Sequence, residues 1–434
     1  MAPRLGRRSV PITPVIVVPG VLGTRLSMPS GSDWDPDSNI AMLQWTQHDI
    51  LTKHRDLNVD LRPNADILTT FSTAAADQIS NNQDLVNIAA ARQRDTISLF
   101  SFRGWAGLAW AFYGNLLIQL ETKLNVTGSV FTNESLPVYA FGYDWRKSNA
   151  ISSQALSTFT NQVLSTEGAD QAILVTHSMG GLVARAEFQQ DAAFVSKVRG
   201  VVHVCMPSNG SVTAYRRFFT GCISPFDFPG DLLQLIPDRL TDFLLAIIMG
   251  QPKEAFATLM SGLPGPMELL PNDSYAAGEP SWLATDPQID LTDVFSAYKG
   301  PFQPGIISDS LDIFLSGVGG GLTGEFVKAA LAARISSAQQ FHGTVGSTTH
   351  PHTIIMSSTG LTTDETVSFV GNMSVNQTAT GDGTVNIASA SCPTLDAGSI
   401  EANTSVNGLE HAKVFADDAF MLALVSHVNH FVLA

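Results

Sequence analysis

The chain has 434 residues, of which 44% are hydrophobic and 15% are charged, so it can bury a large core and is neither a disordered tail nor a coiled coil. Its 39 acidic and 24 basic residues give a formal net charge of -15, a sign that repels phosphate backbones. Nucleic acid is therefore not an expected partner. The length is compatible with two or three domains, or with one large α/β core that carries insertions.

The first residues are basic, but no apolar stretch of signal-peptide length follows them. Seven N-x-[ST] sequons give slight support to secretion over a cytoplasmic location. The charge-free stretch from Gly104 to Leu120 is shorter than the roughly 20 residues that a membrane-spanning helix needs. We therefore expect no transmembrane segment.

Short β-branched runs alternate with helical patterns along the chain, which is typical of a parallel sheet flanked by helices. The predicted strands are Val15–Val18, Val138–Phe141, Ala172–Val175, Val201–Cys205 and Thr353–Met356. The predicted helices between them are Trp105–Leu120, Ile151–Leu164 and one that opens at Ser178. This pattern predicts a core formed by residues 14–206 and 352–434, with an N-terminal extension at 1–13.

About 140 residues interrupt the pattern between the fourth and fifth strands, and we expect residues 207–351 to form an inserted cap or lid. Two helices are predicted in it, at 240–249 and 326–335. A small buried subdomain is the alternative. Because the first helix is apolar on nearly all sides, Leu244 and Ile248 are candidates for contact with an acyl chain. The glycine-rich stretch near Gly319 lacks the lysine of a phosphate-binding loop and predicts a hinge.

The strand that ends near Val175 runs directly into T-H-S-M-G-G and then into a helical pattern. A strand, a tight turn and a helix in this order are typical of a nucleophile elbow, which places a serine hydroxyl above the sheet. Ser178 is therefore the candidate nucleophile. Thr176 replaces the first glycine of the usual motif, so its side chain must point away from the turn. Without further support, Ser178 could equally be an ordinary helix cap.

The segment V-P-G-V-L-G-T follows the first predicted strand, and its glycines allow the backbone to approach a ligand closely. In an acyl-transfer enzyme, an N–H group of such a loop pairs with the N–H after the nucleophile to bind the oxyanion. The expected donors are the backbone groups of Val21 and Met179. A plain Gly-Pro turn is the alternative.

A serine nucleophile needs a base and an orienting carboxylate, which follow it in this fold in the order acid, then histidine. The sequence G-D-G-T-V predicts Asp382 on an exposed, tightly turned loop, and N-G-L-E-H places His411 just before the last helix. We predict these two as acid and base. The rival acids are Asp364 and Asp396, and the rival bases, within a helical pattern, are His427 and His430.

Other residue clusters carry weaker signals. His342, His350 and His352 could form a zinc site, but exposed histidines before a strand explain them more simply, so no metal and no cofactor is expected. The aromatic residues from Trp105 to Tyr113 could line an acyl tunnel, although such a stripe is more often core. A bridge between Cys205 and Cys222 is an option, but the apolar run around Cys205 favours a buried thiol.

Taken together, several segments resemble the lecithin:cholesterol acyltransferase and lysosomal phospholipase A2 family of α/β-hydrolases. They are P-G-V-L-G-T, Y-D-W-R, H-S-M-G-G, M-P-S-N-G-S, L-P-G-P-M-E-L-L-P, G-D-G-T-V and the His411 loop, in family order from about Pro14 onward. The resemblance implies Ser178, Asp382 and His411 as the triad, with a cap over the site. Met206 and Ser208 depart from the family's Thr-Pro pattern, and no cysteine pair lies near Trp34.

We therefore expect an α/β-hydrolase fold and a serine esterase of the lipase, phospholipase or acyltransferase type. Its substrate would be a lipid or another hydrophobic ester, bound by residues that include Leu22, Leu244 and Ile248. Transient contact with a membrane or lipid surface is an option, and the oligomeric state is open. The alternative is a non-catalytic lipid-binding protein on the same scaffold.

Overall fold

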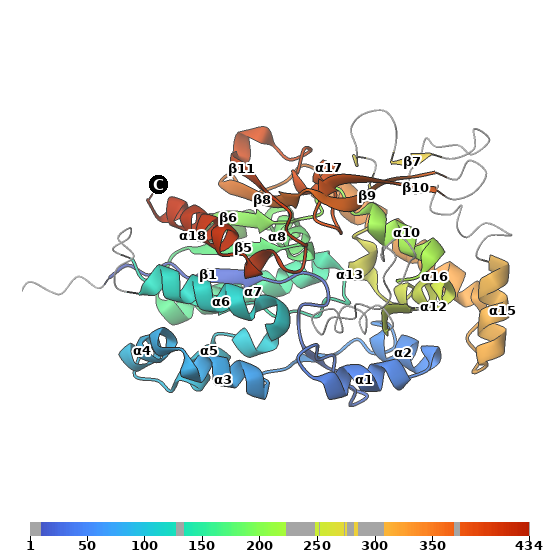
Figure 1. Cartoon of the computed structure of the whole chain (residues 1–434), viewed down its shortest axis with the longest axis horizontal. Helices are drawn as coiled ribbons and strands as arrows, with labels where there is room; N and C mark the ends of the chain where they lie inside the picture. Colours follow the sequence, from blue (N-terminus) through green and yellow to red (C-terminus); the bar gives the residue numbers. More distant parts are fainter. Residues whose placement is uncertain are drawn as a thin grey trace, which may run out of the picture.

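The computed structural model describes residues 10–126, 134–222, 248–250, 252–272, 274–275, 282–284, 308–368 and 374–433. At its centre lies a six-stranded sheet in which every neighbouring pair is parallel (Figure 1). The strands, in spatial order, are β11 (Ile400–Asn407), β8 (Thr353–Thr359), β6 (Val198–Val204), β5 (Ala172–His177), β1 (Val15–Val18) and β4 (Val138–Ala140). This architecture confirms the predicted α/β class with a parallel central sheet.

Strands β1 and β5 are buried along their whole length because both faces of the sheet are covered. Side chains alternate between the two faces, so Ile16 and Val18 enter one hydrophobic core while Val15 and Val17 enter the other. Covering on both sides explains why these strands read as continuous apolar runs in the sequence.

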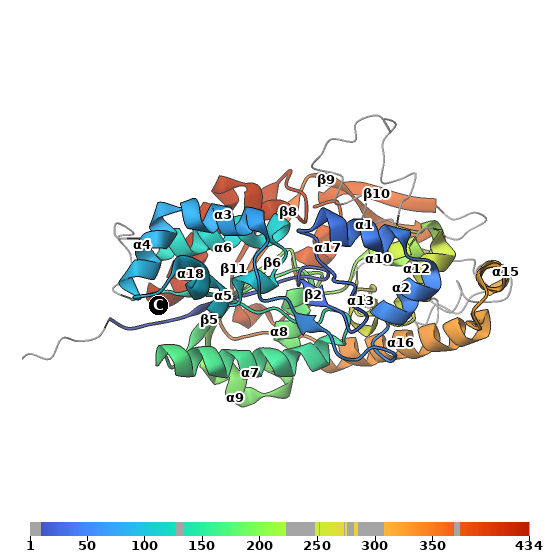
Figure 2. The ribbon, with the colours of Figure 1, turned by 90° about the horizontal axis from the view of Figure 1, so that it is seen from below.

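Helices cover each face of the sheet. The pair α6 (Trp110–Asn125) and α18 (Asp418–Leu433) packs in one core, and the pair α7 (Asn149–Glu167) and α8 (Met179–Gln190) packs in the other. Figure 2 shows α6 and α7 on opposite sides of the molecule. The predicted helix at Trp105–Leu120 is wrong at its start, because a short 3₁₀ turn at Trp105–Gly107 precedes α6.

Five helices between β1 and α6 were not predicted. They are α1 (Asn39–Gln47), α2 (Ile50–Leu57), α3 (Thr73–Asn81), α4 (Gln83–Ala91) and α5 (Thr96–Phe102). Each begins at a Ser, Asp or Asn whose side chain accepts a hydrogen bond from a backbone N–H of the first turn. Trp34 joins this region to the core through edge contacts with Trp45 and Trp145, with ring centroids 6.1 and 5.1 Å apart.

The described part of residues 207–351 contains further helices and a two-residue strand. They are α10 (Val212–Thr220), α12 (Lys253–Met260), α13 (Pro264–Met267), β7 (Leu283–Ala284), α15 (Ser308–Val318) and α16 (Gly324–Val345). The predicted helix at 326–335 lies within α16. Gly319, Gly320 and Gly321 all have positive φ in the turn before α16.

The predicted acyl-binding helix at 240–249 lies mostly outside the described residues, and so does Leu244. Its described end corrects the expectation of exposed apolar surface, because Ile248 is fully buried and packed in a hydrophobic core. Ile248 also borders a cavity of about 290 Å³ whose other walls come from α2, α12 and α15.

A second sheet follows β8, in which the antiparallel pair β9 (Leu361–Ser368) and β10 (Ser374–Gly381) adds β7 at its edge. A two-residue ladder also pairs β2 (Leu26–Ser27) with β3 (Asp66–Ile67). Short helices complete the described chain: α9 (Ala192–Lys197), α17 (Ile387–Ala390), and 3₁₀ turns at Ala397–Ser399 and Val414–Ala416. Neither β9, β10 nor β11 was predicted.

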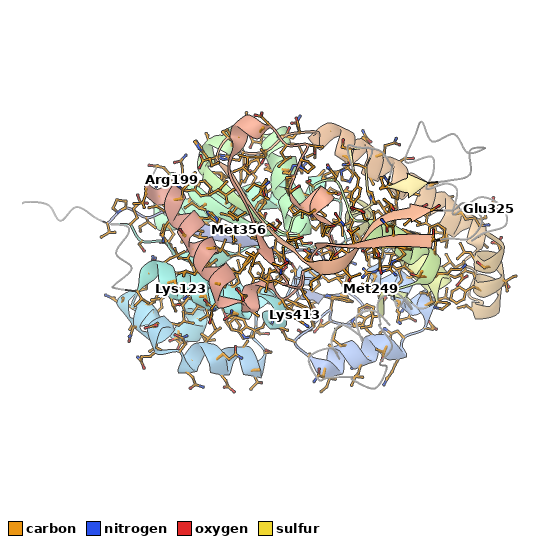
Figure 3. All side chains as sticks on the ribbon, turned by 45° about the horizontal axis from the view of Figure 1, so that its top comes forward. Lys123, Arg199, Met249, Glu325, Met356 and Lys413 are labelled. Atoms are coloured by element: carbon orange, nitrogen blue, oxygen red, sulfur yellow. The ribbon has the colours of Figure 1, made fainter. Side chains whose placement is uncertain are left out.

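Charged side chains such as Lys123 and Glu325 are exposed, whereas Met356 on β8 is buried (Figure 3). Cys205 is a free, buried thiol, so the optional bridge to Cys222 is not formed. Within the described residues, no helix combines the length and the apolar character needed to cross a membrane.

Candidate active site

Ser178 occupies a sharp turn between the end of β5 and the start of α8, with φ 52° and ψ -127°. The turn is tight because Gly180 and Gly181 allow close packing: an added Cβ at Gly180 would lie 2.5 Å from the carbonyl oxygen of Val18, and one at Gly181 would strike the Met206 side chain. Thr176 meets the condition set by the sequence, since its Oγ1 lies 2.7 Å from Nδ1 of His203 on the neighbouring strand. The backbone therefore has the form of a nucleophile elbow.

The structure brings the three predicted triad residues together. His411 Nε2 lies 2.9 Å from Ser178 Oγ, and His411 Nδ1 lies 2.7 Å from Asp382 Oδ2. Ser178 is 6% exposed, and the His411 side chain is 12% exposed. This geometry allows His411 to accept the serine proton while Asp382 orients the imidazole.

The expectation that Asp382 lies on an exposed loop is wrong, because the residue is only 1% exposed. Burial raises its pKa, but His411 and the N–H groups of Val385 and Thr384 outweigh this effect and hold the pKa below the ordinary value. The two N–H groups donate to Asp382 Oδ1 at 2.7 and 3.0 Å. The carboxylate is therefore held in its charged form.

Cys205 is a residue of this site that the sequence analysis assigned only to the core. Its Sγ lies within 4.8 Å of the ligand atoms of Asp382 and His411, directly after β6. Burial and the neighbouring Asp382 raise the pKa of the thiol well above its ordinary value. Among the described residues these three form a cluster of metal-ligand type, but a protonated thiol and a carboxylate already bonded to His411 are poor ligands for an ion.

The rival acids and bases have other partners. Asp364 is buried in an ion pair with Arg216 at 2.6 Å, and Asp396 caps the 3₁₀ turn at Ala397–Ser399. His430 bonds to Glu401 at 2.7 Å, and His427 lies on α18 with it.

The expectation that the histidines at 342–352 are all exposed is also wrong. His350 is buried between the backbone carbonyls of Val195 and His352, and His342 Nε2 lies 2.9 Å from the Glu268 carbonyl. Only His352 is exposed. Each ring is therefore used in a separate hydrogen-bonding arrangement.

The loop after β1 lies against the elbow. An added Cβ at Gly20 would lie 2.8 Å from Ser178 Cβ, so only glycine permits this approach. Tyr143 Oη donates to the Pro19 carbonyl at 2.9 Å and holds the loop from the other side. The N–H groups of Val21 and Met179 have no hydrogen-bond partner among the described residues, so both remain available to a ligand. Leu22, the next residue, has φ 64° and is partly buried.

The M-P-S-N-G-S segment, which departs from the family pattern, supports the Asp382 loop. Ser211 Oγ donates to the Thr384 carbonyl at 2.6 Å, and Ser208 Oγ donates to the Ser389 carbonyl at 2.7 Å. The two serines therefore tie the segment after β6 to the Asp382 loop and to α17, which follows that loop.

A parallel sheet with a nucleophile elbow at its centre and a histidine loop after its last strand defines the α/β-hydrolase class. The family model for lecithin:cholesterol acyltransferase matches residues 120–229, a stretch that contains Ser178. The chain therefore has an α/β-hydrolase fold and is similar to the lecithin:cholesterol acyltransferase family over this stretch.

Individual relatives are more distant. The uncharacterized protein YJR098C of Saccharomyces cerevisiae is 39% identical over 77 residues, which are 18% of this chain and only 11% of that protein. A chain of the Tle4-Tli4 complex has the same fold, with a TM-score of 0.69 at 18% identity over 98% of this chain and 99% of that one. The match to the Bacillus licheniformis lipase BlEst2 covers 98% of this chain and 96% of the lipase, at 9% identity and a TM-score of 0.33.

Proposed function

We propose that the protein is a serine ester hydrolase or acyltransferase that acts on lipid-like esters through an acyl-Ser178 intermediate. The observation that carries this proposal is the unbroken series of contacts from Ser178 Oγ to His411 and from His411 to the buried, charged Asp382. A buried carboxylate that orients a histidine against a serine at an elbow is the arrangement of a nucleophilic ester hydrolase.

In the proposed reaction, Ser178 Oγ attacks the ester carbonyl as His411 Nε2 takes its proton. The N–H groups of Val21 and Met179 donate to the oxyanion, since neither has another hydrogen-bond partner in the part of the chain that the structure describes. His411 then gives the proton to the leaving alcohol. Water or an acceptor alcohol, deprotonated by His411, releases the acyl group from Ser178.

The match to the lecithin:cholesterol acyltransferase family model supports a lipid ester as substrate. Leu22 follows the oxyanion loop directly and is placed to meet the acyl chain near its carbonyl. The inserted residues 207–351 remain the proposed cap. Ile248, being fully buried, would act there through the packing of the cap rather than as an exposed acyl contact.

Labelling with a fluorophosphonate probe tests the proposal and its non-catalytic alternative. The probe forms a covalent bond with an activated serine, so the wild type should be labelled at Ser178 and Ser178→Ala should not. Turnover of p-nitrophenyl esters should fall by a factor on the order of 10⁴ to 10⁶ in that variant, with the fold intact. An unlabelled wild type would favour the lipid-binding protein.

The choice between water and alcohol as acceptor has its own experiment. p-Nitrophenyl esters of rising chain length, with and without added long-chain alcohol, separate hydrolysis from transfer by the products formed. A preference for long acyl chains would support a lipid substrate, whereas equal rates on acetate and palmitate esters would contradict it.

A further inference from the structure

Three segments far apart in the sequence meet at the hydroxyl group of Tyr113, at the end of the first turn of α6. The N–H of Gly20 donates to Tyr113 Oη at 2.8 Å, and the same oxygen lies 2.9 Å from His177 Nδ1. On its other side, His177 Nε2 lies 3.1 Å from the backbone oxygen of His411. All of these groups are buried or nearly so.

The protons in this chain of contacts can be assigned from chemistry. A carbonyl oxygen only accepts, so His177 Nε2 carries a proton and donates to His411. Burial lowers the pKa of His177 to about 3, so the ring is neutral and its Nδ1 has a bare lone pair. Tyr113 must then donate its proton to Nδ1, which leaves its oxygen lone pairs for the Gly20 N–H. The Gly20 N–H, the Tyr113 O–H and the His177 Nε2–H each donate one hydrogen bond. The three bonds therefore link the loop after β1 to the backbone of His411.

The two ends of this chain are parts of the proposed catalytic machinery. Gly20 precedes Val21, the proposed oxyanion donor, and its own N–H is occupied by Tyr113. The Gly20 N–H is therefore not available to substrate, whereas the Val21 N–H has no partner among the described residues. At the other end, the carbonyl that accepts from His177 belongs to His411 itself. His177 is also the residue directly before Ser178.

Tyr113 is itself firmly placed, because the start of α6 is fixed to the oxyanion loop. The Ala109 N–H donates to the Gly23 carbonyl at 2.9 Å, and the Tyr113 ring lies so close to Gly23 that an added Cβ there would be 2.7 Å from Cε2. The first turn of α6 lacks a capping side chain of its own and is capped instead by Asp37, which accepts from Trp110 and Ala111.

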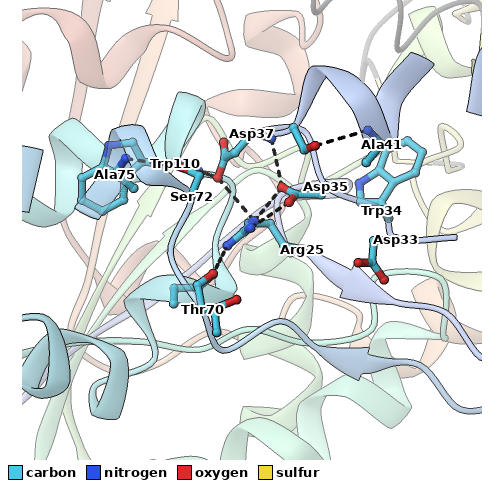
Figure 4. A network of polar contacts seen from close by, with 12 residues as sticks. Arg25, Asp33, Trp34, Asp35, Asp37, Ala41, Thr70, Ser72, Ala75 and Trp110 are labelled. Carbon is cyan, nitrogen blue, oxygen red and sulfur yellow. Dashed lines mark hydrogen bonds and ion pairs between the residues drawn. The ribbon is translucent and has the colours of Figure 1, made fainter. Parts of the chain in front are cut away.

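Asp37 is in turn held by Arg25, which also binds Asp35 through two hydrogen bonds of 2.7 Å (Figure 4). Burial raises the pKa of Asp37, partly offset by the two N–H groups and by Arg25. The position of the Tyr113 hydroxyl is therefore set by a buried polar network and not by the α6 helix alone.

We propose that Tyr113 and His177 are positioning residues that hold the oxyanion loop and the His411 backbone in register with Ser178. This inference rests on the proposed function. If the pair had a purely structural role, each side chain would only provide a hydrogen-bond partner for the other. Its loss would then lower stability and leave the chemical step unchanged.

The variant Tyr113→Phe tests the proposal because it keeps the ring and removes one oxygen atom. It leaves the Gly20 N–H and His177 Nδ1 without a partner among the described residues. We expect kcat on a p-nitrophenyl ester to fall by about 10- to 100-fold, with KM within about twofold, because a misplaced oxyanion donor affects the transition state more than the bound ester. The rate of fluorophosphonate labelling should fall in parallel.

Tyr139→Phe is the matched control, since this tyrosine on β4 also loses a buried hydroxyl, which donates to Glu167 at 2.7 Å. Its kcat should remain that of the wild type. Circular dichroism and thermal unfolding of both variants show whether each is folded. A normal kcat in folded Tyr113→Phe, with the wild type labelled at Ser178, would overturn the positioning role alone. An unlabelled wild type would overturn the proposed function as well.

A double-mutant cycle tests whether the pair acts as one unit. His177→Leu removes both hydrogen bonds, whereas His177→Gln keeps an N–H that can reach the His411 carbonyl and should retain more activity. The double variant Tyr113→Phe/His177→Leu should lose little more kcat than the worse single variant; if His177→Leu does not fold, His177→Gln replaces it in the cycle. Losses that multiply would show independent effects and contradict the proposal.

Discussion

Ser178 adopts a backbone conformation that residues other than glycine rarely take. Leu22 and Cys205 share this property, with φ of 64° and 49°. The three follow β1, β5 and β6 in the central sheet, so strained residues gather at the ends of adjacent strands around the candidate site. Strain of this kind persists only where the surrounding structure enforces it, which supports a functional reason for the geometry.

Asp382 is the residue whose charge is easiest to test. Asp382→Asn keeps the shape of the side chain but removes the negative charge that stabilises protonated His411. We expect kcat to fall by a factor on the order of 10⁴, with the fold retained, as measured by ester turnover and circular dichroism.

Asp396→Asn is the control for this substitution. Asp396 is a rival acid from the sequence, lies exposed at the start of a 3₁₀ turn and does not contact His411. Its activity should equal that of the wild type. If Asp396→Asn were inactive and Asp382→Asn active, the assignment of the acid would be wrong.

The candidate residues that the sequence predicted are those with a local signal. Ser178 and Asp382 lie in short glycine-containing motifs whose turn geometry can be inferred from the residues themselves. Tyr113 carries no such signal, because its partners come from the β1 loop and the end of β5. Its helical spacing in an aromatic stripe is that of an ordinary core residue, which it also is.

At the scale of single elements, the start of α7 depends on a carboxyl group that comes just after α13. Glu268, 1% exposed, accepts from Ser148 Oγ at 2.6 Å and from the Asn149 N–H at 2.8 Å. Burial raises its pKa to about 7, although these contacts lower it. Glu268 thus joins α7 to the L-P-G-P-M-E-L-L-P segment and is neutral in mildly acidic solution.

A raised carboxyl pKa gives a definite sign to the pH dependence of stability. The unfolded chain releases this proton near its ordinary pKa, about 4.3, so the folded state loses stability as the pH rises from there through about 7. Glu268→Gln cannot ionise and should gain thermal stability relative to the wild type between pH 5.5 and pH 8. Glu325→Gln, at an exposed position on α16, should show no such change. A constant difference between wild type and Glu268→Gln across this range would contradict the assignment.

The elements predicted from sequence are those buried on both sides. β1, β5 and β8 were found because two-sided burial selects continuous apolar runs. β11 was missed because it lies at the edge of the sheet and alternates partly buried with exposed residues in the sequence I-E-A-N-T-S-V-N. The helices α1 to α5 were missed because they are short, and their caps give a weaker signal than a long apolar stripe.

At the scale of the whole molecule, buried or half-buried neutral histidines are spread over distant parts of the fold. Burial lowers the pKa of His177 and His203 to about 3 and that of His342 to about 4. They lie on β5, β6 and α16 respectively. As the pH falls, these histidines are protonated near pH 6.5 in the unfolded chain but only at a lower pH in the folded chain. The folded state therefore loses stability as the pH falls below about 6.5.

We therefore expect the urea midpoint of unfolding to be lower at pH 5 than at pH 7. His203→Gln removes one of these groups while leaving an acceptor for the Thr176 hydroxyl. It should lower the number of protons taken up on unfolding at pH 5 by about one, so its stability should depend less on pH. If His203→Gln showed the same dependence on pH as the wild type, this histidine would not contribute to acid stability, whatever the opposing effect of Glu268.

The order of the strands has a consequence for the time at which activity can begin. The strands β4, β1, β5 and β6 are neighbours in the sheet and are all complete by residue 204, whereas β8 and β11 extend its edge from residues 353 to 407. A chain emerging from the ribosome can thus assemble the Ser178 turn long before Asp382 and His411 have been synthesised. If Ser178 acts as proposed, the unfinished protein carries an unactivated serine, and the proposed cleavage of lipid esters begins only once the final strands have joined.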